Sequence, residues 1–184
     1  MRANFRKLAW AFLLILLDIH IFIFDIFPDF IGYLLIISAL HKLDRHYSGY
    51  KKAWPVALVL CVLSLVPTPP QFSLQQQAPP PSPLWVGITG LHLVLLLVLV
   101  FAILSTLTRH ASSQGLQELA YASRNRMRFF CFLQLVMLFV TPYSLNTDDA
   151  VLAVVALTIL LLLAMILIMF LFRKSAKAFA ASDA

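Results

Sequence analysis

The stretch ILLLLAMILIMFLF (residues 159–172) contains no charged side chain, and LHLVLLLVLVFAILSTL (91–107) is almost as apolar. A helix that spans a membrane needs about 20 predominantly apolar residues, because the hydrocarbon core is about 30 Å thick. A chain of 184 residues could not cover both stretches with a soluble core. They predict an all-α, polytopic membrane protein.

The overall composition agrees with this interpretation. Hydrophobic residues make up 61% of the chain and charged residues only 12%, whereas a soluble domain averages about 25% charged residues. The mean hydropathy is +0.90. We therefore expect one transmembrane domain over residues 1–184, integral to the cell membrane, with the lipid bilayer as its main partner.

Hydropathy and the basic flanks divide the chain into six expected spanning helices. Their approximate ranges are 7–27, 29–46, 52–67, 84–108, 126–142 and 149–172. The N-terminus resembles a signal peptide but lacks a small-residue cleavage site, so we interpret it as an uncleaved first span. The apolar part of the second segment, 30–40, covers only about 16 Å as a helix, so a re-entrant hairpin is the alternative there.

The positions of the basic residues favour six spans over that alternative. The net charge is +6, and all 14 Lys and Arg residues fall into four clusters. Cytoplasmic loops carry an excess of Lys and Arg, and six spans with both termini in the cytoplasm place every cluster on that side. This pattern disfavours nucleic-acid binding. The clusters are Arg2, Arg6, Lys7; Lys42, Arg45, Lys51, Lys52; Arg109, Arg124, Arg126, Arg128; and Arg173, Lys174, Lys177.

Two loops have distinctive compositions. The outer segment PTPPQFSLQQQAPPPSP (67–83) carries no charge and is proline-rich, which favours an extended, semi-rigid polyproline II strap. The inner segment 109–125 is polar, and within it we expect a short interfacial helix with Leu116, Leu119 and Ala120 facing lipid.

The candidate site lies in DIHIFIFDIFPDFIGY (18–33), where Asp18 falls about 15 Å into the first span. A carboxylate at that depth costs about 2.5–3.5 kcal/mol and persists when it is protonated, paired or in contact with water. Asp18 and Asp25, seven residues apart, share a helix face that leads outward. We expect an outward-opening polar cavity that binds a solute, cation or proton. Its residues are Asp18, His20, Asp25, Ser38 and His92.

Structural roles compete with these functional ones. Asp18 could be a neutral side chain that bonds a neighbouring helix, and His92 a core histidine bonded to a carbonyl. Asp29 can cap the helix that follows it. In PDFIGY (28–33) the glycine suits close packing and the tyrosine an interfacial anchor. Gln134 is expected to form a hydrogen bond between helices.

Other chemistries find no support in the sequence. No H-E-x-x-H, G-x-S-x-G, Walker A or C-x-x-C pattern occurs. We expect no metal and no cofactor, and the sequence favours a non-enzymatic role without excluding an enzyme. Cys61 and Cys131 lie in apolar segments and are interpreted as free thiols. An intramembrane hydrolase with two aspartates would need carboxylates from different helices. The candidates in this sequence lie mostly on one helix, which disfavours that class.

Three function classes follow. The first is a small membrane transport protein with a solute or cation bound near Asp18. The second is the membrane-embedded substrate-binding subunit of a multi-subunit ATP-driven importer, by analogy of architecture alone. The third is a non-catalytic membrane scaffold or regulatory partner. The polar face of the first span favours the first two classes, and a membrane protein partner or a homo-oligomer fits all three.

Overall fold

The computed structural model describes residues 2–16, 27–66, 83–144 and 149–182. Over these ranges the chain is helical and contains no strand, which confirms the predicted all-α class. The elements are α1 (Arg2–Leu16), α2 (Phe27–Asp44), the 3-10 helix η1 (Tyr50–Ala53), α3 (Trp54–Leu63), α4 (Pro83–Ser113), α5 (Gln117–Ser144) and α6 (Asp149–Ser182).

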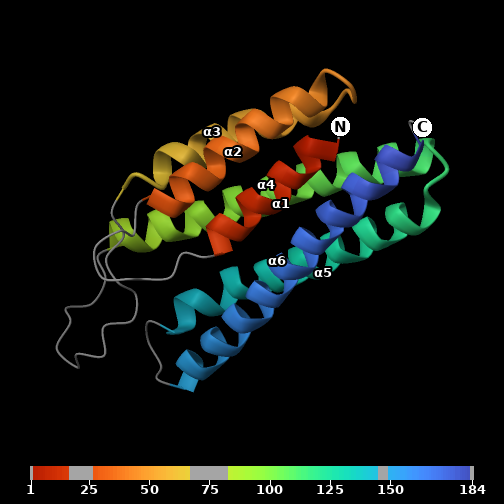
Figure 1. Cartoon of the computed structure of the whole chain (residues 1–184). Coiled ribbons are helices and arrows are strands. Elements are labelled where there is room, and N and C mark those ends of the chain that lie inside the picture. The colour runs from red at the N-terminus through yellow and green to blue at the C-terminus, as the bar shows by residue number, and fades with distance from the viewer. Residues whose placement is uncertain (1, 17–26, 67–82, 145–148, 183–184) are drawn as a thin grey trace.

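The helices run alternately up and down in one elongated bundle (Figure 1). Each packs against its neighbours in sequence, and α1 also packs against α6, so the six helices form a closed ring. Both termini of the described chain lie at the same end, together with the connections α2–η1 and α4–α5 (Figure 1). We call this half of the bundle the termini half, and the other the opposite half.

Two short turns in the termini half explain why the chain reverses there. α4 ends at Ser113, and Gly115 in the turn that follows has a φ of 75°, which is costly for residues with a Cβ. The Leu116 N–H then donates to the Ala111 carbonyl at 2.9 Å, as in a Schellman motif. After α2, Asp44 Oδ1 accepts hydrogen bonds from the backbone N–H groups of Gly49 (3.0 Å) and Lys51 (2.9 Å).

α2 approaches α1 closely at Gly32. A Cβ at this position would lie 2.6 Å from Ile15 Cγ1 and 3.1 Å from the Ala11 carbonyl oxygen. Small residues allow this proximity between helices in membranes. The glycine of PDFIGY therefore packs closely against α1, as expected from the sequence.

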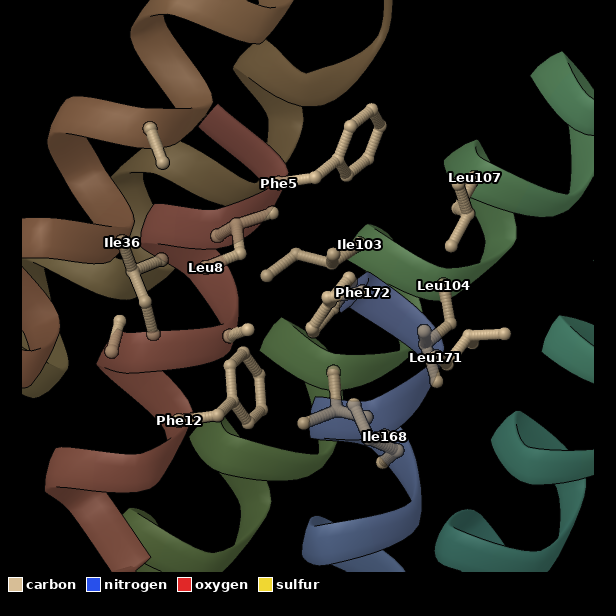
Figure 2. Packing of buried hydrophobic residues seen from close by; sticks show 14 of the residues in the cluster. Phe5, Leu8, Phe12, Ile36, Ile103, Leu104, Leu107, Ile168, Leu171 and Phe172 are labelled. Carbon is tan, nitrogen blue, oxygen red and sulfur yellow. The ribbon is translucent and has the colours of Figure 1, made fainter. Parts of the chain in front are cut away.

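Most of the core of the bundle lies in the termini half. Figure 2 shows Leu8 and Phe12 of α1, Ile103 of α4 and Phe172 of α6 gathered between the helices. These side chains are buried, and the rings of Phe12 and Phe172 lie 5.3 Å apart. The two terminal helices thus close the ring through direct side-chain packing.

The opposite half is packed quite differently. Among the side chains that the structure describes, none is buried at 84–98 of α4, 135–143 of α5 or 152–163 of α6. Large apolar groups such as Phe139, Tyr143 and Leu152 are more than two-thirds exposed. A soluble monomer rarely exposes so much contiguous apolar surface, and a surface of this kind is one that a membrane or a partner protein can cover.

Two described helices are long and apolar enough to cross a membrane, Val86–Ser113 and Leu152–Ala180. By length and composition alone, two such helices indicate a membrane protein only weakly, since the core helix of a soluble protein meets the same criterion. In the most apolar 18-residue stretch of each helix, only 17% and 28% of the residues, respectively, are buried inside the protein. By this criterion only two of the six spans expected from the sequence are supported.

Three expected boundaries are wrong. α5 begins at Gln117 rather than near 126, α6 continues to Ser182 rather than ending near 172, and α3 covers ten residues rather than 52–67. The separate interfacial helix is also wrong, because Leu119 and Ala120 belong to the start of α5 and are buried in the protein, and Leu116 lies just before that helix.

Candidate functional site

The candidate site in the described residues is the contact between His92 of α4 and Tyr33 of α2. The Tyr33 hydroxyl lies 3.4 Å from His92 Nε2, a long hydrogen bond whose donor depends on the histidine tautomer. The two rings meet edge to face, with centroids 6.3 Å apart. Tyr33 is fully buried and His92 is half-buried.

The backbone next to His92 is held from the other side by α5. Gln134, almost fully buried, donates its Nε2–H to the carbonyl oxygen of Leu93 at 3.1 Å. This confirms the expected inter-helix role of Gln134. His92 therefore lies on a segment of α4 that contacts both α2 and α5, next to the packed core of the termini half.

Several residues predicted for the cavity cannot be placed beside His92. Asp18, His20 and Asp25 lie outside the described residues. Ser38 is half-buried in α2, five residues beyond Tyr33. That spacing corresponds to about 7.5 Å along the helix and about 140° around it, so Ser38 does not share the face that Tyr33 presents to His92.

Two interpretations of the PDFIGY segment need correction. Tyr33 is not an interfacial anchor, because its ring is 0% exposed and reaches α4. Asp29 does not occupy the N-cap position, because α2 already begins at Phe27. Asp29 instead lies in the first turn of α2, where its negative charge still meets the positive end of the helix dipole.

The sequence did not identify Tyr33 as the partner of His92. Tyrosine near the expected outer surface resembles an aromatic belt residue, and nothing local distinguishes that role from burial. The sequence separation of 59 residues between the two partners explains the omission. The expected alternative for His92, a bond to a carbonyl within the core, is replaced by this contact with a hydroxyl.

A second polar cluster lies in the termini half and has a structural role. The ring of His110 lies 4.9 Å from that of Tyr47, and its Nε2 is 3.0 Å from the Ser48 carbonyl oxygen. Gln114 donates to the Tyr47 hydroxyl at 3.2 Å. The nearby Tyr50 is buried, and burial, with a smaller effect of Tyr47, raises the pKa of its hydroxyl far above the usual range. These contacts fasten the turn after α2 to the end of α4.

The described part of the chain contains no group of three or more His, Cys, Asp or Glu side chains that could hold a metal ion. Cys61 and Cys131 are free thiols, as expected. No protein-family model, curated protein or solved structure matches the chain.

Proposed function

We propose that the chain is an integral membrane protein with six spans and both termini in the cytoplasm. The alternating bundle supports this, because it places both termini and the described turns with their basic clusters at one end (Figure 1). α2 extends over 18 residues through His41 and Lys42, about 27 Å, which suits a span with snorkelling ends rather than a re-entrant segment. The exposed apolar faces of all the other helices would then contact lipid.

We further propose that the protein is a small transporter whose polar site opens to the outside. The observation that carries this proposal is the contrast between the two halves of the bundle. The termini half is filled by an apolar core, whereas His92 stands in the opposite half, where the long helices have no buried side chains. Water and solutes would reach His92 from the outer side only, and release inward would require the core between α1, α4 and α6 to open.

Asp18, His20 and Asp25 would complete the proposed site, whereas Ser38 lies on another face of α2. A carboxylate in the membrane commonly marks an ion path, a proton relay or a ligand site. Asp18 would hold the proton or cation, and Asp25 would lie on its route from the outer surface. His92 would contribute a second titratable group from another helix, positioned by Tyr33.

Replacing Asp18 by asparagine should abolish most of the proton or cation flux through the protein. Membrane insertion should remain intact, because asparagine keeps the shape of the side chain but cannot carry its charge. Replacing His92 by glutamine should lower the flux as well. The measurement uses proteoliposomes with an entrapped pH-sensitive dye, an imposed pH gradient and either Na⁺ or K⁺ outside. His46→Gln is the matched control, because His46 is exposed in the turn after α2.

A native chain that leaves the gradient unchanged with every cation, or an Asp18→Asn variant with native flux, would contradict the proposal. The substrate-binding subunit of an ATP-driven importer would use the same polar site but would require partners. Purification from the native membrane in a mild detergent separates these cases. Recovery of an ATPase and a second membrane subunit in stoichiometric amounts would favour the importer subunit.

A further inference from the structure

A basic groove lies between α1 and α6 in the termini half, away from the proposed transport site. Its volume is about 630 Å³, within the roughly 300–1,000 Å³ typical of small-molecule sites. The groove is lined by four cations, two aromatic rings and Ala176, and no acidic residue is among its lining residues. The cations and rings are Arg6, Trp10, Phe170, Arg173, Lys174 and Lys177.

Most of this positive charge is not neutralised by the protein. Lys174 approaches Glu118 at 3.7 Å. Arg6, Arg173 and Lys177 form no ion pair within the described residues, and all three are exposed. Three guanidinium and ammonium groups that converge on one groove favour a multiply bonded anion such as a phosphate ester.

The order of side chains along both helices matches a molecule with an apolar and an anionic end. On α1, Trp10 lies farther from the N-terminal end of the helix than Arg6 does, and on α6, Phe170 lies farther from the C-terminal end than Arg173 and Lys177 do. Trp10 and Phe170 are 52% and 51% exposed. The Arg173 guanidinium lies 5.8 Å from the Trp10 ring centre, a cation–π contact that joins the basic and aromatic layers.

We infer that this groove binds the phosphate-bearing headgroup of an anionic phospholipid from the cytoplasmic leaflet, with the acyl chains against Trp10 and Phe170. Basic pockets between transmembrane helices on this side are suited to such headgroups. The site is formed by the first and last helices, whose rings of Phe5 and Phe179 stack at 5.2 Å nearby. A bound headgroup would bridge Arg6 to Arg173 and so reinforce the closure of the ring.

The inference rests on the membrane insertion proposed above, and the test separates the two. The variant Trp54→Phe/Trp85→Phe leaves Trp10 as the only one of the three tryptophans. It is reconstituted into two vesicle sets of identical phosphatidylcholine and phosphatidylglycerol content, which differ only in which lipid is brominated. Bromine quenches tryptophan fluorescence on contact, so the two sets report which lipid lies against Trp10.

Brominated phosphatidylglycerol should quench Trp10 more strongly than brominated phosphatidylcholine. Adding Arg173→Gln/Lys177→Gln should reduce the apparent preference by about ten-fold or more. The matched control Lys51→Gln/Lys52→Gln removes the same charge from exposed positions in the same half, and should leave the preference unchanged.

Equal quenching by the two lipids, or a preference that survives Arg173→Gln/Lys177→Gln, would overturn the lipid site. Loss of the preference on adding excess inorganic phosphate would also overturn it, because the groove would then bind a soluble phosphate compound. No quenching by either lipid would contradict membrane insertion itself rather than the headgroup site.

Discussion

Replacing Phe172 by alanine should destabilise the folded bundle by about 3 kcal/mol or more, because a large buried ring is removed and the core can only partly collapse. Phe172 is 0% exposed and lies 5.3 Å from the ring of Phe12, at the point where α6 meets α1. The midpoint of thermal unfolding in detergent should fall by on the order of 10 °C. Size-exclusion chromatography of heated samples gives this midpoint.

Phe139→Ala is the matched control for this experiment. Phe139 is 74% exposed on α5 in the opposite half, so its truncation should shift the midpoint little. If Phe172→Ala and Phe139→Ala had equal effects, the packed core would not lie in the termini half, and the contrast between the halves on which the proposed transport depends would be lost.

Gly32→Ala should also destabilise the protein, by about 1–3 kcal/mol, although alanine is a better helix former than glycine. The new methyl group would lie 2.6 Å from Ile15 Cγ1, which is a methylene inside the side chain and not its mobile end, and 3.1 Å from a backbone oxygen. α1 and α2 would have to move apart. The same thermal measurement reports the change.

Gly90→Ala provides the comparison for Gly32. Both glycines are helical, but a Cβ at Gly90 has nothing within 4 Å, so this substitution should be neutral or stabilise α4 by up to about 1 kcal/mol. A stabilising effect of Gly32→Ala would contradict the close contact between α1 and α2.

The sequence predicts the helical class and the approximate position of most helices, because apolar runs such as 91–107 and 159–172 leave little choice. It does not predict where helices end outside those runs. Hydropathy falls at Arg173, yet α6 continues to Ser182 because alanine and lysine are good helix formers. Likewise, the polar segment from Gln117 is helical, and the turn at Gly115 separates it from α4.

The site is less predictable than the fold. His92 and Gln134 stand out as polar residues in apolar segments, and the structure gives both of them inter-helix hydrogen bonds. The contact between Tyr33 and His92 and the groove of Arg6 and Arg173 arise from how distant helices pack. Sequence spacing carries no signal for either, because each brings together residues from different helices.

The account depends most on whether every helix crosses the membrane, and α3 is the critical case because it is the shortest α-helix that the structure describes. The most direct measurement is labelling of single cysteines with a membrane-impermeant maleimide in intact cells, after Cys61→Ala/Cys131→Ala removes the native thiols. Cysteines are introduced one at a time by Ser48→Cys, Gln117→Cys, Ser73→Cys and Thr147→Cys.

Positions 73 and 147 should react in intact cells, and positions 48 and 117 only after permeabilisation. Residues 48 and 73 lie on either side of α3 in the chain, so only a spanning α3 places them on opposite sides of the membrane. The same reactivity at 48 and 73 would contradict six spans, and with them the outward-opening site around Asp18 and His92.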